Sequence, residues 1–137
     1  MRKDIGIGLL GLGVVGCGVV KALTTKAGSL AEQAGLPLVL KKVLVRDANK
    51  RRSIGISPNL LTTHPEEIFA RPDVDIVIEL IGGEHPAREY IEQAIANGRH
   101  VVTANKEVIA KHGYELLSLS RKYNTDLRYE ASVGSGI

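Results

Sequence analysis

Three glycines stand at G-x-G-x-x-G spacing near the start of the chain, in the hexapeptide Gly11-Leu12-Gly13-Val14-Val15-Gly16. The spacing often occurs by chance, but here it follows an apolar, strand-like run and opens a helix-like one. In that context Gly11 allows a tight turn, Gly13 lets backbone approach a pyrophosphate at the helix N-terminus, and Gly16 lets the helix lie close to the strand. The hexapeptide therefore predicts a dinucleotide-binding loop. A close-packed strand–turn–helix without a ligand is the alternative.

Three further glycines and the only cysteine surround this loop. We interpret Gly6 and Gly8 as small strand residues that make room for a helix, and Gly18 as a packing residue too. Cys17 lies inside the expected helix, where a small buried apolar residue is a better interpretation than a nucleophile.

The end of the expected second strand bears on the choice of cofactor. It reads Leu44-Val45-Arg46-Asp47, and basic residues follow at positions 50–52. NAD-specific domains carry an acid here for the adenosine ribose, whereas an arginine suits the 2′-phosphate of NADP. Arg46 occupies this position, which favours NADP over NAD. Two alternatives stay open: a strand end one residue later would make Asp47 an NAD-type acid, and the basic residues could form a solvated turn.

The segment from Glu79 to Pro86 follows another apolar strand, and ligands of open α/β sheets lie beyond the C-terminal ends of the strands. The backbone at Ile81 and Gly82, with the next glycine, is placed to meet the nicotinamide ribose or the second phosphate. A flexible loop without a ligand is the alternative. Glu79 falls within the apolar strand and needs a partner if it is buried, but the sequence does not identify one.

A second polar strand end reads Thr103-Ala104-Asn105-Lys106. We expect all four residues on the nicotinamide side of the cofactor. A lysine there can stabilise a developing alkoxide, hold a carboxylate or, with a lowered pKa, transfer a proton. The alternative is an exposed residue in the first turn of a helix, which is unfavourable because a cation opposes the helix dipole at that end. We therefore take Lys106 as the candidate catalytic residue.

These segments alternate in type along the chain. Strand-like runs cover Ile5–Leu10, Leu38–Val45, Ile76–Ile81, His100–Thr103 and Leu127–Tyr129. Helix-like runs cover Val14–Thr25, with a possible continuation through Ala34, then Pro65–Ala70, Pro86–Asn97 and Lys106–Tyr123, the last with a break near Gly113. Apolar strands that alternate with helices predict an α/β fold, a Rossmann-type doubly wound and mostly parallel sheet.

Composition narrows the class of protein. The 137 residues are enough for one domain, and no apolar run approaches the roughly 18 residues of a membrane span. A net charge of +3 with one Phe and no Trp gives little material for nucleic-acid binding. The single cysteine fits a reducing, cytoplasmic setting. The four histidines share no metal-ligand spacing, and we interpret them as loop or surface residues.

Several segments together resemble the N-terminal, nucleotide-binding part of homoserine dehydrogenase. They are the glycine loop, VLVRD (Val43–Asp47), DIVIELIGG (Asp75–Gly83), HVVTANKEVIAKHG (His100–Gly113) and YEASVGSGI (Tyr129–Ile137). They follow the family's order and span almost the whole chain. A glucose–fructose oxidoreductase-type enzyme is a rival, but that family typically reads Glu-Lys-Pro where this chain has Asn105-Lys106-Glu107. A nucleotide-sensing module without chemistry is a second rival.

The resemblance implies an NAD- or NADP-dependent enzyme that interconverts L-homoserine and L-aspartate 4-semialdehyde in threonine, methionine and isoleucine biosynthesis. It implies that Lys106 assists catalysis and that the full-length enzyme is a homodimer. It also implies a monovalent cation site, with Na⁺ expected, at the Glu130 side chain and the carbonyls of Val133, Ser135 and Ile137. Ser135 departs from the family's usual glycine or alanine.

The family's substrate domain has no counterpart in these residues, and the chain stops inside the last matching motif. We therefore expect residues 1–137 to form an NAD(P)-binding domain that binds nucleotide with negligible turnover by itself.

Overall fold

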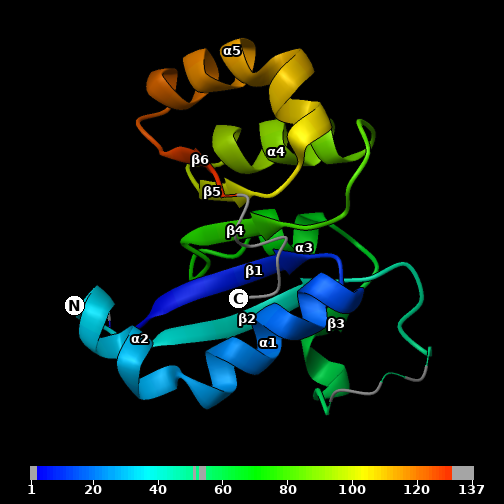
Figure 1. Ribbon diagram of the computed structural model, residues 1–137, viewed down its shortest axis with the longest axis vertical. Coiled ribbons are helices and arrows are strands. Elements are labelled where there is room, and N and C mark those ends of the chain that lie inside the picture. The colour runs from blue at the N-terminus through cyan, green and yellow to red at the C-terminus, as the bar shows by residue number, and fades with distance from the viewer. Residues whose placement is uncertain (1–2, 51, 53–54, 131–137) are drawn as a thin grey trace.

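A computed structural model describes residues 3–50, 52 and 55–130 of the chain. Its centre is a six-stranded sheet in the order β3-β2-β1-β4-β5-β6, with every neighbouring pair parallel (Figure 1). The strands are β1 (Ile5–Leu10), β2 (Leu38–Leu44), β3 (Leu61–Thr62), β4 (Ile76–Glu79), β5 (His100–Thr103) and β6 (Leu127–Tyr129). This order is that of the Rossmann fold. The predicted doubly wound α/β class is confirmed, and the sheet is wholly rather than mostly parallel.

Helices cover the sheet on two sides because successive strand residues point to opposite faces. They are α1 (Val14–Thr25), α2 (Ala27–Ala34), α3 (Glu66–Phe69), α4 (Ala87–Ala96) and α5 (Lys106–Lys122), with a short 3₁₀ turn, η1 (Pro58–Leu60). Leu9 and Val43 pack with α1, whereas Leu10, Val77 and Val101 pack in a second core with α3, α4 and α5. In Figure 1, α4 and α5 lie together beside β5 and β6, and α1 and α2 lie beside β2.

One predicted feature of the helices is wrong, and the end of the first helix is confirmed. The predicted break near Gly113 is wrong: α5 is continuous, and Gly113 is buried within it. Packing of α5 on α4 outweighs the low helix propensity of one glycine. The first helix ends at Thr25, as predicted, and residues Ala27–Ala34 form the separate helix α2. The hydroxyls of Thr24 and Thr25 bond to the carbonyls of Val20 and Lys21, a pattern that bends helices.

The strand ends also differ slightly from expectation. β2 and β4 are shorter than predicted, and β3, which has only two residues, was not predicted. β4 stops at Glu79 because the Glu79 carboxylate accepts the N–H of Ile81, which therefore leaves the sheet ladder. β3 is defined by its pairing with β2, a long-range contact that a two-residue run does not reveal.

The structure tests which of the glycines outside the loop are needed for packing. A Cβ at Gly8 would lie 2.5 Å from the Ile68 side chain on α3, so this strand glycine makes room for a helix, as expected. A Cβ at Gly6 would meet the Asp73 carbonyl. At Gly18 the packing prediction is wrong, because a Cβ there would meet no described atom within 4 Å. Cys17 is half-buried rather than buried.

The strand register brings the candidate site residues to one edge. Leu44, Leu10, Glu79 and Thr103 are successive partners across β2, β1, β4 and β5, and each stands at the C-terminal end of its strand. The loops that follow these four strands therefore gather at the carboxyl edge, where ligands of open α/β sheets bind. The sheet order reverses direction between β1 and β4, at the glycine loop.

Candidate functional site

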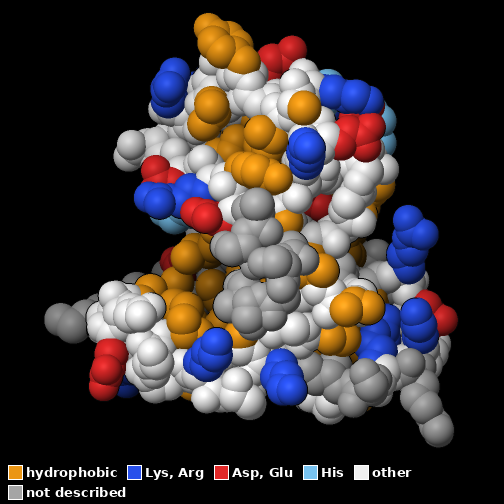
Figure 2. Space-filling model, viewed as in Figure 1, with side chains coloured by type: hydrophobic (Ala, Val, Ile, Leu, Met, Phe, Trp, Pro, Cys, Tyr) orange, Lys and Arg blue, Asp and Glu red, His pale blue; other side chains and the backbone are white. Residues whose placement is uncertain are grey.

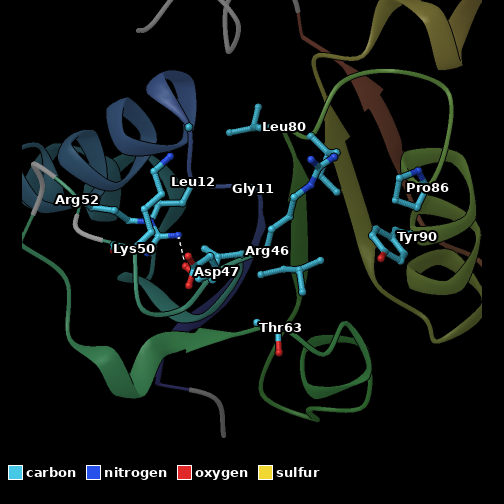
Figure 3. A pocket seen from close by; sticks show the side chains of 14 residues that line it. Gly11, Leu12, Arg46, Asp47, Lys50, Arg52, Thr63, Leu80, Pro86 and Tyr90 are labelled. Atoms are coloured by element: carbon cyan, nitrogen blue, oxygen red, sulfur yellow. Dashed lines mark hydrogen bonds between the residues drawn. The ribbon is translucent and has the colours of Figure 1, made fainter.

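A cavity of about 570 Å³ opens at the carboxyl edge of β1, β2 and β4 (Figure 3). This volume is within the usual range of ligand pockets, about 300–1,000 Å³. The cavity is lined by Gly11, Leu12, Gly13, Leu44, Val45, Arg46, Asp47, Lys50, Arg52, Thr63, Leu80, Ile81, Pro86 and Tyr90. Figure 3 shows Pro86 and Tyr90 on one side and Lys50 and Arg52 on the other, with Gly11, Arg46 and Asp47 between them.

The glycine loop forms the tight turn from β1 into α1. Gly11 has φ +102°, and a Cβ at Gly16 would lie 2.4 Å from the Gly11 carbonyl oxygen, so the turn itself requires both glycines. Gly13 differs, because its φ is −84° and a Cβ there would meet no described atom within 4 Å. No side chain caps the N-terminus of α1, and its first turn holds no acid. The amides of this first turn thus face an open space at the positive end of the helix.

Basic residues form the far end of the cavity, beyond β2. The Arg46 and Lys50 side chains are exposed and have no hydrogen bond or ion pair within the described ranges. Arg52 is committed to the turn, since its guanidinium donates to the carbonyls of Asp47 and Lys50 at 2.7 and 3.0 Å. The Asp47 carboxylate accepts the Asn49 N–H at 2.9 Å. Figure 2 shows Lys and Arg side chains gathered over the loop after β2.

Glu79 forms hydrogen bonds with the Thr103 side chain and with two backbone amides. The sequence alone did not identify these partners. Glu79 is fully buried; one of its oxygens accepts the Thr103 hydroxyl and the other accepts the N–H groups of Ile81 and Gly82 at 2.8 and 3.2 Å. The Thr103 hydroxyl accepts the Asn105 N–H at 3.0 Å, and the Asn105 amide group donates to the Gly83 carbonyl at 2.7 Å. These bonds connect the loop after β4 with the end of β5.

Lys106 is the first residue of α5, directly after this network. The Asn105 side chain caps the helix by accepting the Val108 N–H at 3.0 Å, so the backbone at Lys106 is held on both sides. The Lys106 side chain is exposed and has no ion pair in the part of the chain that the structure describes. Glu107, its neighbour, pairs with Lys111 at 2.9 Å instead. An unpaired ammonium on a fixed backbone suits interaction with a substrate.

Some of the predicted cofactor residues line the cavity, and the others do not. The cavity collects Gly11, Leu12, Gly13, Arg46 and Ile81. The others lie outside its lining: Val14, Val15, Gly16, Gly82, Thr103, Ala104, Asn105 and Lys106. The roles assigned to them stay predictions.

Only one residue of the predicted cation site lies in the described ranges. Glu130 is exposed just after β6, and its N–H donates to the Thr103 carbonyl at 3.0 Å. Val133, Ser135 and Ile137 lie outside the described residues. Within the described ranges, no group of three or more His, Cys, Asp and Glu side chains is arranged to hold a metal ion.

Comparison with known proteins agrees with this geometry. The family described as "Homoserine dehydrogenase, NAD binding domain" matches residues 11–130. This chain belongs to that family. The homoserine dehydrogenase of Bacillus subtilis is 44% identical over 135 residues, which are 98% of this chain and 31% of that protein. That of Corynebacterium glutamicum is 41% identical over 97% of this chain and 30% of that protein.

Solved structures of homoserine dehydrogenases share the fold of this NAD binding domain. The enzyme from Thiobacillus denitrificans superposes with a TM-score of 0.87 at 42% identity, over 95% of this chain and 30% of that one. The S. aureus enzyme superposes with a TM-score of 0.88 at 37% identity, over 96% and 33%. The chain thus spans about a third of the length of its relatives. Among the described residues, no helix is long and apolar enough to cross a membrane.

A charged cluster joins the loop after β4 to α5 on the outside of the NAD binding domain. The His112 imidazole donates to Glu84 at 2.6 Å, and the Lys111 ammonium lies 3.1 Å from the other oxygen. His112 and then Lys111 lower the pKa of Glu84 from its usual 4.5 to about 2. Close by, a hydrogen bond with Glu89 raises the pKa of His85. His112 was expected to be a loop or surface residue, but it is a half-buried residue of α5.

The pKa of Glu84 predicts a pH dependence of stability. Because the folded protein keeps this carboxylate ionised below pH 4.5, the cluster stabilises the fold above that pH and loses its contribution as the pH falls to about 2. Glu84→Gln should therefore flatten the fall in unfolding temperature between those values, as measured by circular dichroism. Glu32→Gln, at an exposed α2 residue, is the control and should keep the original slope. The same slope in both variants would contradict the role of Glu84.

Several lining residues were missed by the sequence reasoning. Thr63 and Tyr90 line the cavity, yet no motif contains them, and Pro86 closes the Glu79–Pro86 segment without a predicted contact. Thr63 follows the unpredicted β3, so its position depends on a long-range pairing. Pro86 and Tyr90 had a usable signal, because they lie three and seven residues after Gly83, at the start of the helix that follows a loop already expected to contact the cofactor.

Proposed function

We propose that this chain is the cofactor-binding domain of an enzyme that interconverts L-homoserine and L-aspartate 4-semialdehyde, and that it binds NADP in preference to NAD. The main support for the proposed cofactor site is the absence of a side chain at Gly13. Its backbone conformation does not require a glycine, and a Cβ there, before the uncapped end of α1, would meet no described atom within 4 Å. A pyrophosphate against the α1 amides accounts for the missing side chain.

Other parts of the chain fit the rest of a dinucleotide. The cavity extends from the α1 N-terminus to Arg46 and Lys50, two cations that pair with no described residue and are suited to a 2′-phosphate. In the opposite direction, Ile81 and the glycines after it lead from the cavity toward Lys106. A bound nicotinamide takes up or gives back a hydride, and the protein's part is orientation and charge. Lys106 would polarise the oxygen of the substrate's terminal carbon.

The substrate, the cation and the assembly are supported by family membership rather than by this chain's geometry. Homoserine and aspartate 4-semialdehyde would contact Lys106 together with residues of a longer protein. Na⁺ would bind the Glu130 side chain with the carbonyls of Val133, Ser135 and Ile137, since oxygen ligands suit hard cations. We expect the longer protein to be a cytoplasmic homodimer in threonine, methionine and isoleucine biosynthesis.

Calorimetric titration of the 137-residue chain with NADP⁺ and NAD⁺ tests the proposed cofactor site. We expect saturable binding of both nucleotides, with NADP⁺ the tighter. Failure of the folded chain to bind either nucleotide would remove the proposal. Tighter binding of NAD⁺ would remove only the preference, and it would point to Asp47 as the ribose ligand.

The Arg46→Ala variant tests the basis of the preference. It should weaken NADP⁺ binding by about 10- to 100-fold, because a charge-assisted hydrogen bond contributes about 1.5–3 kcal/mol, and should leave NAD⁺ binding nearly unchanged. Arg121→Ala, at an exposed residue in the last turn of α5, serves as the control for general loss of positive charge. Equal weakening of both nucleotides by Arg46→Ala would refute the phosphate contact.

A further inference from the structure

The carboxylate of Glu79 is buried at the floor of the carboxyl edge, between the cavity and Lys106. Glu79 is 0% exposed and accepts three hydrogen bonds, from the Thr103 hydroxyl and from the amides of Ile81 and Gly82. Burial of a carboxylate is costly unless it is fully hydrogen-bonded. An apolar side chain would fill this core position without that cost. The carboxylate therefore calls for an explanation beyond packing.

The hydrogen bonds of Glu79 close a ring. From Glu79 the ring runs through the Gly82 amide and along the backbone to the Gly83 carbonyl. It continues through the Asn105 side chain and backbone amide to the Thr103 hydroxyl, which donates back to Glu79. Because Glu79, Thr103 and Asn105 each make two bonds of the ring, the ring locks the loop after β4 to the start of α5.

The loop that the ring holds would otherwise have wide conformational freedom. Gly82 and Gly83 have φ angles of +81° and +73°, both are exposed, and a Cβ at either would meet no described atom within 4 Å. Glycines sample such conformations freely and do not select one. Glu79 fixes one conformation of this loop, since its carboxylate accepts hydrogen bonds from the amides of Ile81 and Gly82. On the other side of the ring, Asn105 holds the backbone that carries Lys106.

We propose that Glu79, acting through Thr103, is a positioning residue that sets the Ile81–Gly83 loop and Lys106 in one geometry for the nicotinamide half of the dinucleotide. This inference rests on the proposed function. It assigns Thr103 and Asn105 to the support of the site, because both side chains are buried and bonded inside the ring. Gly13 and Arg46, where we place the adenine half, make none of the ring's hydrogen bonds.

The proposal is tested by comparing a ligand that fills both halves of the site with one that fills only the adenine half. The affinity of the 137-residue chain is measured for the reduced dinucleotide that it binds more tightly, NADH or NADPH. It is measured again for the adenine half alone, 5′-AMP or 2′,5′-ADP, which lacks the nicotinamide, its ribose and the second phosphate. Fluorescence of the bound reduced nicotinamide is recorded in parallel. A structural effect would weaken both ligands, whereas a positioning effect weakens only the dinucleotide.

Glu79→Gln and the pair Thr103→Val and Thr103→Ser are the variants. Valine keeps the shape of threonine but breaks two bonds of the ring, and serine keeps the hydroxyl. We expect Glu79→Gln and Thr103→Val to weaken the dinucleotide by about 10-fold and alter its nicotinamide fluorescence, with the nicotinamide-free ligand within about twofold. Thr103→Ser should bind both ligands as the unaltered chain does.

Equal weakening of both ligands by Thr103→Val, or no change in either, would overturn the inference even if Glu79→Gln fails to fold. An unaltered chain that binds neither ligand would instead remove the proposed function, and this inference with it.

Discussion

Lys106→Ala, made in the longer protein that carries this chain, should lower kcat for homoserine oxidation by about 10²–10³-fold, which is the usual loss when a group that stabilises a developing oxyanion is removed. The dissociation constant of the cofactor should change by less than about threefold, because Lys106 lies outside the lining of the cavity that holds the proposed adenine and pyrophosphate sites. Steady-state kinetics and calorimetry of the same preparation measure both quantities.

The structure gives a physical reason for this separation. The Lys106 backbone is fixed by the Asn105 cap and the Asn105 bond to Gly83, while the ammonium is exposed and without an ion pair among the described residues. Alanine at the first position of a helix should leave α5 intact. The effect should therefore fall on the reaction and not on folding.

Lys122→Ala is the control for Lys106, since it removes an exposed lysine at the other end of the same helix. It should leave kcat unchanged. Full activity of Lys106→Ala would remove this residue from the chemistry. If homoserine oxidation were also absent from the unaltered protein, a nucleotide-sensing module would be the better interpretation.

Gly13→Ser should weaken NADP⁺ binding by about 10- to 100-fold, because its side chain would occupy the space in front of the α1 amides. A serine hydroxyl also caps helix N-termini, so it would compete for the N–H groups that a pyrophosphate needs. For the same reason the free energy of unfolding should stay within about 0.5 kcal/mol of the original. Calorimetric titration and urea unfolding check the two expectations.

Gly18→Ala is the matched control for Gly13→Ser. A Cβ at Gly18 would also meet no described atom within 4 Å, but Gly18 lies inside α1 and outside the cavity lining. Alanine should stabilise the helix by about 1 kcal/mol and leave NADP⁺ binding unchanged. NADP⁺ binding by Gly13→Ser at the original affinity would mean that the open end of α1 is not the phosphate site.

The sequence by itself determined the fold class and the positions of the main strands and helices. These follow from the periodicity of apolar residues and from the spacing of glycines. Both patterns extend over only a few residues, so a single segment of sequence is enough to recognise them. It also determined the turn at Gly11 and the close approach at Gly16, because a strand followed at once by a helix leaves few alternatives. Gly18 shows the limit of that argument, since the same residue type in the same helix packs against nothing described.

The tertiary structure alone decided how the site is held together. Glu79 meets Thr103 across 24 residues of sequence, and Asn105 meets Gly83 across 22. Strand order and register create both contacts, because β4 and β5 are neighbours with Glu79 paired to Thr103. No local pattern encodes such a pairing. The continuity of α5 through Gly113 has the same origin, since packing on α4 overrides the propensity that a local argument uses.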